Sequence, residues 1–463
     1  MAEPKEAVTI AGAGLVGSLL AINLARRGHP VEVLERRADM RRETVEAGRS
    51  INLAISTRGL YALRQLGLED EALRHAIPMR GRMIHSPRGE LTFQPYGKDD
   101  SQHINSLSRG WLNQFLMTRA EETGRVNIRF RQRVSGVNLK AGEIRVVDEA
   151  TGASRDVRPG VLFGTDGSGS VLRHTLAAWS DAQVTQEQLG HGYKELTIPP
   201  GAGGRFQMEK HALHIWPRGT YMLIALPNED GSFTCTLFLP WQGPVSFASL
   251  DTPARLEAFF QEQFADARAL IPDLVQAFFA RPTGHMVTVK SPRWRLGGGT
   301  LLLGDAAHAI VPFYGQGMNC GFEDCTVLEA CLDRHATWEG AFAEFERLRK
   351  TNADAIADMA VENFIEMRDS TADPRFLLEK GVEKVLLNAF PGEFVSRYSL
   401  VSFSRVPYRL AYELGALASG IVSELARELT RPEDVDLTRA GQLIRARMVP
   451  FMKENADGFR TEG

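Results

Sequence analysis

The chain of 463 residues is long enough for two or three domains, and its 43% apolar and 24% charged residues are ordinary for a soluble globular protein. A formal net charge of -3 predicts no strong attraction to nucleic acid or to an anionic membrane surface. Because no run of 18 apolar residues occurs and the N-terminus is too polar for a signal peptide, we expect a cytoplasmic protein with no membrane span.

A glycine-rich turn between a strand and a helix is the first predicted element. The apolar residues 8–11 lead into the motif GAGLVG at residues 12–17, and a helix is predicted over residues 18–27. A second short strand is predicted at Val31–Leu34. This order of strand, turn, helix and strand is typical of a dinucleotide-binding fold.

Each glycine of the motif has its own physical reason. Gly12 permits the tight turn, Gly14 lets a pyrophosphate approach the backbone, and Gly17 lets the helix pack closely on the sheet. Glu35 lies 18 residues beyond Gly17, at a strand end where a carboxylate binds the hydroxyl pair of a ribose. The alternative is a glycine turn in an α/β fold that binds no ligand.

A basic loop is expected next, over residues 36–42, and its Arg36 or Arg37 could contact adenine or phosphate. Residues 48–56 are predicted to form a strand followed by a helix that is capped at residue 56 or 57. These elements extend the first domain.

A second acidic strand end follows after a helix over residues 109–123, a strand over 126–130 and a β-hairpin over 134–147. A buried strand from residue 161 ends in Asp166, and Arg173 lies seven residues further on. An acid at a strand end with a base on the next helix suits a second contact to a dinucleotide. A simple β-turn would explain the same residues.

The segment from about residue 174 to 286 differs in character. Alternating apolar residues over 213–216, 221–226 and 233–239 predict antiparallel strands. They favour a second sheet that covers a pocket over the first domain.

The chain then returns to the first domain. A strand over residues 300–303 ends in Gly304-Asp305, and a loop with Pro312, a turn over 315–317 and a helix that carries Asn319 follow. A helix start rich in glycine leaves backbone N–H groups unpaired, so it can hold an anion or a polarised ring edge. A carboxylate at a strand end can accept hydrogen bonds from a sugar-phosphate.

Helices are predicted over residues 323–332, 338–365, 376–389 and 408–428. Apolar residues recur at helical spacing in the last of them, which favours core packing or an oligomer face, a homodimer included, over membrane-surface binding. These residues are Leu410, Leu414, Leu417, Ile421, Leu425 and Leu429. The four cysteines contain no C-x-x-C pair, and three share one predicted helix, so reduced core thiols are expected and no metal site.

Three distant pieces, residues 12–35, 166–173 and 304–319, are therefore expected to build one dinucleotide site. A nicotinamide dehydrogenase normally needs only the first piece. A long flavin dinucleotide needs contacts at both of its ends, which places the isoalloxazine near residues 312–319. The single glycine fingerprint predicts no second domain for a permanently bound nicotinamide cofactor.

These pieces resemble the three signatures of the single-component, class A flavoprotein monooxygenases. Within that class, local strings over about residues 8–409 resemble the kynurenine-hydroxylating branch. They are GRSINLA at 48–54, MRGRMIH at 79–85, HIWPR at 214–218, FTCTLF at 233–238, HAIVPFYGQGMN at 308–319 and FIEMR at 364–368. Eukaryotic members end in an apolar membrane anchor, whereas this chain ends in polar residues, so a soluble, bacterial-type version is expected.

The resemblance implies an α/β fold with three regions. A Rossmann-like FAD-binding domain would comprise residues 1–75, 100–175 and 286–330. An antiparallel β-sheet substrate domain would comprise residues 76–99 and 176–285, and a helical C-terminal region residues 331–463.

The resemblance also implies the reaction. FAD is reduced by transiently bound NADPH, O2 adds to give a flavin C4a-hydroperoxide, and L-kynurenine is hydroxylated to 3-hydroxykynurenine. Because the substrate's aniline activates its own ring, we expect no catalytic base from the protein.

Matching positions name the residues expected to bind the substrate. Arg82 would hold the carboxylate, Tyr96 and Asn363 would complete its hydrogen bonds, and Tyr398 would contact the substrate. Phe313, with Tyr314, would form the wall between flavin and substrate. Glu366 and Met367 are second choices beside Asn363, and His308 is expected to be structural.

Matching positions also name the residues expected to bind FAD. Glu35 would bind the ribose, Arg109 the pyrophosphate or ribityl region and Asp305 the ribityl chain, while the Met318 and Asn319 amides would face the pyrimidine edge. The full set of expected cofactor contacts is Gly12, Gly14, Val16, Gly17, Glu35, Arg36, Ala54, Arg109, Val134, Asp305, Gly317, Met318 and Asn319.

Other functions stay open from the sequence. One is a class A hydroxylase of another aromatic compound, such as a phenol or a quinolone. Another is a flavin-dependent reductase or epoxidase of apolar lipids, and the non-enzyme alternative is a protein that binds FAD without catalysis.

Overall fold

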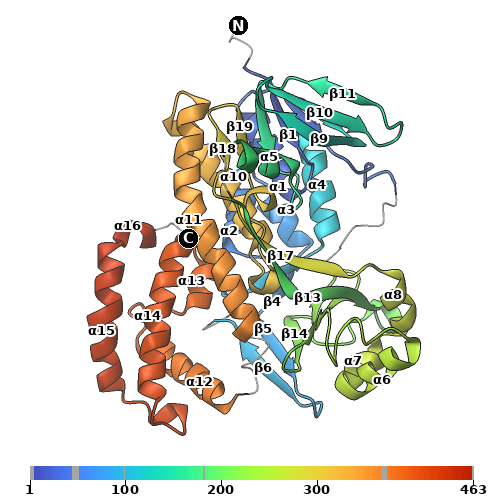
Figure 1. Cartoon of the computed structure of the whole chain (residues 1–463). Coiled ribbons are helices and arrows are strands. Elements are labelled where there is room, and N and C mark those ends of the chain that lie inside the picture. Colours follow the sequence, from blue (N-terminus) through green and yellow to red (C-terminus); the bar gives the residue numbers. More distant parts are fainter. Residues whose placement is uncertain (1–4, 44–51, 98–99, 181–182, 367–372, 461–463) are drawn as a thin grey trace.

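The glycine-rich turn lies where the sequence predicts it, between a buried strand and a helix. The computed structural model describes residues 5–43, 52–97, 100–180, 183–366 and 373–460 (Figure 1). In it, β1 (Val8–Ala11) leads into α1 (Leu15–Arg26), and β2 (Val31–Leu34) follows. The helix begins three residues earlier than predicted, so Gly17 lies inside its first turn.

Six strands form the first sheet, in the order β18-β19-β12-β1-β2-β8. Strand β18 runs antiparallel to β19, and the other neighbours are parallel. Their added bounds are β8 Val126–Arg129, β12 Val161–Gly164, β18 Arg295–Leu296 and β19 Thr300–Leu302. Because β1, β12 and β19 are neighbours, all three predicted pieces of the dinucleotide site meet at the carboxyl edge of this sheet.

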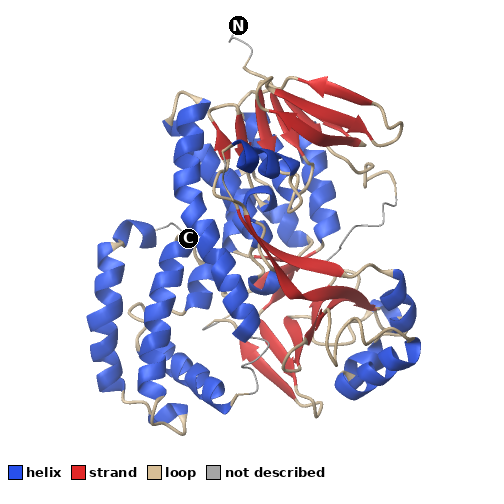
Figure 2. Cartoon of the chain, in the orientation of Figure 1, coloured by secondary structure: helices blue, strands red, loops and turns tan. Residues whose placement is uncertain are grey.

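Helices and two small sheets surround the first sheet (Figure 2). The predicted hairpin is confirmed, and a third strand that the sequence did not predict extends it. Residue 56 precedes a helix, as predicted, whereas residues 48–51 lie outside the described residues. The bounds are β3 Leu53–Ile55, α2 Thr57–Gln65, α3 Glu69–Arg74, β4 Ile77–Met79, β7 Ile104–Leu107, α4 Arg109–Glu122, β9 Gln132–Asn138, β10 Glu143–Asp148, β11 Ser154–Val157 and α5 Val171–Trp179.

The predicted second sheet is confirmed, with the order β17-β13-β16-β15-β14-β5-β6. Its neighbours are antiparallel except β14 and β5, which are parallel. The bounds are β5 Gly81–His85, β6 Leu91–Pro95, β13 Thr185–Ile198, η1 Ala202–Gly204, β14 Ala212–Pro217, β15 Met222–Pro227, β16 Phe233–Pro240 and β17 Gly284–Lys290.

Three helices within this segment were missed by the sequence analysis. They are α6 Pro253–Gln263, α7 Ala265–Leu270 and α8 Leu274–Ala280. Phe259, Phe260 and Phe278 of these helices pack with Trp216 and the strands of the second sheet into one buried cluster. The sequence did not indicate these helices, because short helices packed on a sheet have too few turns to show a clear period.

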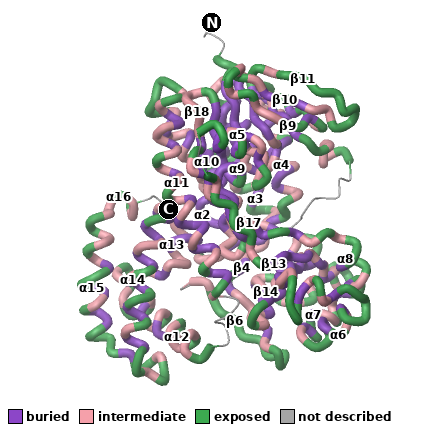
Figure 3. The backbone as a smooth tube through the Cα atoms, viewed as in Figure 1, coloured by how far each residue is buried: buried purple, intermediate pink, exposed green. Residues whose placement is uncertain are grey.

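The C-terminal part is helical, as predicted, and lies beside both sheets in Figure 1. The stripe on α14 is core packing, because its side chains are buried or half-buried in one cluster with neighbouring helices. Figure 3 marks buried segments of the chain in purple, and such segments occur along α14. Helices α13, α15 and α16 were not predicted. The bounds are α9 Asp305–His308, η2 Pro312–Tyr314, α10 Gly317–Arg334, α11 Trp338–Ile365, α12 Pro374–Ala389, α13 Arg397–Phe403, α14 Tyr408–Ala426, η4 Pro432–Asp434, α15 Leu437–Glu454 and α16 Ala456–Phe459.

The expectation for the cysteines is also confirmed. All four cysteines are buried and free, and three of them lie on α10. None of the helices in the described part of the chain has the length and apolar character needed to cross a membrane.

A buried histidine pair makes the second sheet sensitive to pH. His214 Nε2 donates to the Glu209 carbonyl at 2.8 Å, and its Nδ1 lies 2.9 Å from His85 Nε2. His85 Nδ1 lies 2.7 Å from the Asp266 carboxylate. Burial lowers the pKa of His214 to about 4, which disfavours its charged form in the folded protein.

We expect the free energy of unfolding to fall as the pH drops from about 6.5 to 4, because the unfolded chain protonates His214 first. A lowering of this size corresponds to about 3 kcal/mol. In urea unfolding experiments across this pH range, the free energy of unfolding should therefore fall less for His214→Gln than for the unsubstituted chain. An identical pH dependence in the two proteins would contradict this assignment.

Candidate active site

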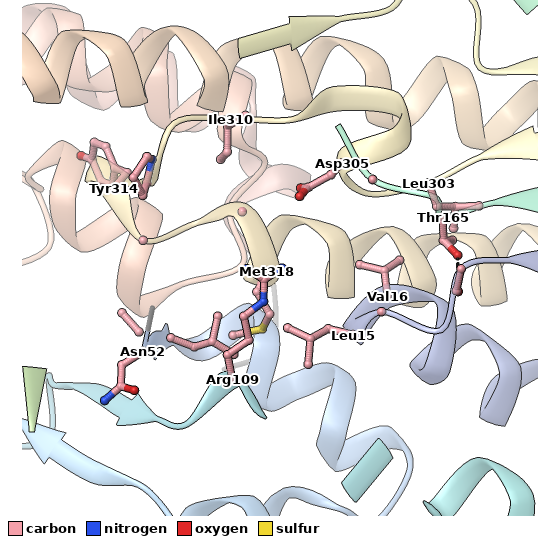
Figure 4. Close-up of a pocket in the computed structure, with 18 of the residues that line it drawn as sticks. Leu15, Val16, Asn52, Arg109, Thr165, Leu303, Asp305, Ile310, Tyr314 and Met318 are labelled. Atoms are coloured by element: carbon pink, nitrogen blue, oxygen red, sulfur yellow. Dashed lines mark hydrogen bonds between the residues drawn. The ribbon is translucent and has the colours of Figure 1, made fainter. Parts of the chain in front are cut away.

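One extended cavity of about 500 Å³ lies at the carboxyl edge of the first sheet, with the second sheet opposite. Residues from the glycine turn, the loop after β19 and the start of α10 face the same space in Figure 4. The predicted residues that line it are Gly12, Gly14, Val16, Glu35, Arg36, Ala54, Arg109, Val134, Asp305, Gly317 and Met318, together with Arg82, Tyr96, Phe313 and Tyr398.

The glycines of the turn differ in what surrounds them. A Cβ at Gly17 would lie 2.0 Å from the Gly12 carbonyl oxygen, and one at Gly12 would lie 2.6 Å from the Thr165 carbonyl oxygen. Gly12 also has a φ of +103°, which other residues rarely adopt. Nothing lies within 4 Å of a Cβ at Gly14. Gly12 and Gly17 thus close the turn, Gly14 leaves open space at the cavity, and Gly17 itself does not line it.

The Glu35 carboxylate is buried at the same end of the cavity. Its Oε2 accepts from the Ala13 amide at 2.8 Å, and its Oε1 accepts from the amide and Nε of Arg37 at 2.9 and 2.8 Å. Burial opposes the charge on Glu35, yet these donors outweigh it and lower its pKa. The carboxylate is therefore ionised at neutral pH and ready to accept hydrogen bonds.

Arg37 and Arg36 lie differently. Both are exposed and line the cavity, but Arg37 is paired with Glu35, whereas no ion pair of Arg36 is found within the described residues. Arg37 Nη2 also reaches Glu35 Oε2 at 3.2 Å, so this guanidinium holds both oxygens of the acid. Of the two arginines, Arg36 is the one with a side chain free to face a ligand's phosphate or adenine.

The second acidic strand end is locked by a buried arginine. Asp166 lines the cavity; its Oδ2 accepts from the Val171 amide at 2.9 Å, and its buried Oδ1 makes no hydrogen bond within the described residues. Arg173 is fully buried and donates to the carbonyls of Ser168 and Ala306 at 2.6 and 3.0 Å. Arg173 does not line the cavity but ties the loop after β12 to helix α9, which follows β19.

The loop before α10 forms the other end of the cavity. Gly315 has a φ of +66°, and α10 begins at Gly317, so the first amides of an 18-residue helix lie at the cavity wall. The Asn319 side chain is fully buried and does not line the cavity. Its Oδ1 accepts from the Ser56 amide at 3.0 Å, and its Nδ2 donates to the carbonyls of Ala54 and Gly315 at 2.9 and 2.8 Å.

Arg82 and three tyrosines gather beside this loop. The Arg82 guanidinium lies 5.1 Å from the ring centre of Tyr398 and 5.6 Å from that of Tyr96. The Tyr398 ring stacks on Tyr96 and on Tyr314, at 5.2 and 5.9 Å. Burial raises the pKa of Tyr96 and of Tyr398, so both phenols are protonated at neutral pH and can donate.

Arg82, Tyr96 and Tyr398 interact with one another, but two polar groups of this cluster lack well-aligned hydrogen bonds. Within the described residues, neither the buried Nε of Arg82 nor the buried hydroxyl of Tyr96 makes a hydrogen bond of good geometry. Buried polar groups are nearly always paired in folded proteins. Their position at the cavity wall makes a ligand the natural partner.

The remaining wall is apolar and aromatic. Phe313 lies 4.8 Å from Phe238 and stacks on Phe364 at 4.3 Å. Asn363 does not line the cavity; its Nδ2 donates to the Phe313 carbonyl at 2.8 Å and so fixes this wall. The second sheet adds further apolar lining residues, among them Leu213, Met222, Ile224 and Leu226.

The other candidate residues lie away from the cavity or outside the described residues. His308 is buried and does not line it; its Nε2 lies 2.6 Å from the Asp324 carboxylate. Met367 lies outside the described residues.

Two groups stand out among the lining residues that the sequence analysis missed. Thr165 and Gly169 flank a strand end that was already singled out, so proximity to Asp166 could have found them. Gln132, Arg133, Met222 and Phe238 lie on strands, where alternation alone does not tell which face meets the cavity.

Known proteins resemble this chain over nearly its whole length. A family model described as an FAD binding domain matches residues 5–202 and 241–349. A kynurenine 3-monooxygenase of Myxococcus xanthus is 75% identical, with 99% of each chain covered. One of Stenotrophomonas maltophilia is 48% identical over 88% of this chain and 90% of the relative.

Solved structures resemble its fold. A tetrameric form of 2-methyl-3-hydroxypyridine-5-carboxylic acid oxygenase superposes with a TM-score of 0.65, at 20% identity, over 81% of this chain and 95% of that one. Pseudomonas aeruginosa PqsL in complex with 2-aminobenzoylacetate gives 0.62, at 20% identity, over 79% and 97%.

Proposed function

We infer that this chain, which belongs to the kynurenine 3-monooxygenase family of FAD-dependent monooxygenases, hydroxylates L-kynurenine to 3-hydroxykynurenine. NADPH and O2 are the co-substrates. The bound flavin supplies the oxygen chemistry, while the protein binds, orients and shields the reactants. The observation that carries the substrate assignment is the buried polar cluster of Arg82, Tyr96 and Tyr398 in an otherwise apolar part of the cavity, where Arg82 Nε and the Tyr96 hydroxyl lack well-aligned hydrogen bonds within the described residues.

The residues present fit FAD. The open space at Gly14 suits a pyrophosphate, and the ionised Glu35 suits ribose hydroxyls. We propose that Arg36, Arg109 and Asp305 contact the phosphates and ribityl chain, with Val16, Ala54 and Val134 packing on the cofactor. The amides of residues 317–319 are proposed for the pyrimidine edge, where a helix N-terminus favours negative charge.

For the substrate, we propose that the Arg82 guanidinium binds the amino-acid carboxylate. The Tyr96 and Tyr398 hydroxyls, protonated at neutral pH, would donate to the same group. Phe313 would then pack on the aromatic ring of the substrate. In this arrangement Asn363 acts through the Phe313 carbonyl that it holds.

The reaction in this cavity needs no base from the protein. An aniline activates the ring position that is hydroxylated, so the demand on the chain is for orientation and exclusion of water. The apolar side chains of the second sheet and the aromatic wall supply that dry surface.

The broader proposals follow from the same assignment. The division into an FAD-binding domain, a substrate domain and a C-terminal helical region, with the boundaries given above, is proposed with it. A cytoplasmic location and a homodimer are likewise proposals, and gel filtration of the purified chain tests the second.

The experiment is steady-state NADPH consumption with product analysis. L-Kynurenine is expected to stimulate NADPH oxidation at least tenfold and to yield 3-hydroxykynurenine. A simple phenol and a quinolone serve as controls for another class A hydroxylase. Equal stimulation by either control, or NADPH oxidation without a hydroxylated product, would overturn the assignment.

A further inference from the structure

Tyr408, the first residue of α14, reaches from the C-terminal helices to the loop at the cavity. Its side chain is fully buried, and its hydroxyl donates to Gln316 Oε1 at 2.8 Å. Gln316 is itself buried and occupies the position immediately before α10. The next two residues, Gly317 and Met318, line the cavity.

Gln316 also connects, through hydrogen bonds, to a second wall of the cavity. Its Nε2 donates to the Ser56 hydroxyl at 3.3 Å, and the Ser56 amide donates to Asn319 Oδ1. Asn319 in turn holds the carbonyls of Ala54 and Gly315, both of which belong to lining residues. The side chains from Tyr408 to Asn319 therefore join α14, the start of α10 and the end of β3.

The Tyr408 ring is fixed independently of its hydroxyl. The Arg58 guanidinium lies 3.9 Å from the ring centre, and Arg58 also donates to the Val406 carbonyl at 2.5 Å and pairs with Glu323. A phenylalanine at position 408 would keep this stacking and the packing. It would remove only the hydrogen bond to Gln316, leaving a buried amide oxygen without its donor.

We propose that Tyr408 is a positioning residue, whose hydroxyl fixes Gln316 and thereby orients the Gly317 and Met318 amides at the cavity. The proposal rests on the proposed function, because those amides are taken to face the flavin ring. The phenol is the right donor for the task, since burial raises the pKa of Tyr408 and keeps the proton in place. The C-terminal helices thus contribute to the electrostatics of a site that they do not line at this point.

The test compares Tyr408→Phe with Tyr412→Phe in the FAD-loaded protein. Tyr412 lies one turn further along α14, and its hydroxyl donates to Glu362 at 2.6 Å, away from the loop. For Tyr408→Phe we expect a shifted visible spectrum of the bound flavin, a changed flavin midpoint potential and about tenfold slower reduction by NADPH. The KM for L-kynurenine should stay within about twofold. Tyr412→Phe should match the unsubstituted protein in all four measurements.

A double variant separates positioning from general loosening. Gln316→Leu removes the acceptor, so adding Tyr408→Phe to it should change the flavin spectrum and potential little further. Additive effects, or equal effects of Tyr412→Phe, would overturn the proposal, as would an unchanged spectrum and potential in Tyr408→Phe. If the unsubstituted chain fails to bind FAD or to respond to L-kynurenine, the proposed function fails instead.

Discussion

Arg82→Ala is expected to raise the KM for L-kynurenine at least tenfold while FAD binding stays nearly unchanged. Charge-assisted hydrogen bonds of this kind contribute about 1.5–3 kcal/mol, which corresponds to roughly 10- to 150-fold. The guanidinium lies beside the stacked rings of two protonated tyrosines at the apolar end of the cavity. Among the described lining residues at this end, Arg82 is the group that carries a positive charge toward a carboxylate.

Arg80→Ala is the matched control. Arg80 is two residues away, exposed, and pairs with Asp100 at 3.4 Å on the surface, so its loss should leave the KM within about twofold. Arg82→Lys keeps the charge but not the planar fork, and we expect an intermediate KM. Steady-state kinetics and flavin titration measure both quantities. Loss of flavin with an unchanged KM would make Arg82 a residue of the fold and not of the substrate site.

Much of the nucleotide end was predictable because its reasons are local. A tight turn, a close backbone approach and a helix pressed on a sheet each require glycine at a fixed spacing, which Gly12, Gly14 and Gly17 satisfy. The predicted bounds of α11 agree with the structure at both ends, because a long amphipathic helix repeats its signal many times.

At the flavin-ring and substrate end of the cavity, the sequence could not show which side chains contact the ligand and which hold the surrounding loops. Asn363 was expected at the ligand, yet its side chain holds the Phe313 carbonyl from behind the wall. The Asn319 side chain likewise holds the Gly315 carbonyl, while its backbone amide is the group proposed for the flavin. Both residues are close to the cavity, and only the direction of the side chain separates the two roles. The link from Tyr408 to Gln316 spans 92 positions, so no local pattern could indicate it.

A buried network of charged side chains joins α10 and α11 next to the cavity. Arg349, on α11, donates to Asp324 Oδ1 at 2.7 Å and to Glu323 Oε2 at 2.5 Å, both on α10. The other Asp324 oxygen accepts from the Gly304 amide at 2.9 Å and lies 2.6 Å from His308 Nε2. Burial opposes the charge on Asp324 and Glu323, but the neighbouring cations outweigh it and hold both pKa values below their usual range.

Arg349→Met is expected to lower the free energy of unfolding by about 3–5 kcal/mol, because it leaves two buried carboxylates without their shared cation. Arg347→Met is the control on the same helix: Arg347 is exposed and lies 3.7 Å from Glu344, so its loss should cost less than about 1 kcal/mol. Urea unfolding at equal flavin content measures the difference. Removing Arg349 also raises the pKa of Asp324 and Glu323 in the folded protein, so the deficit should shrink as the pH falls and these acids bind protons. If Arg349→Met and Arg347→Met lowered the free energy of unfolding equally at pH 7, the ion pairs of Arg349 would contribute no more than a surface contact.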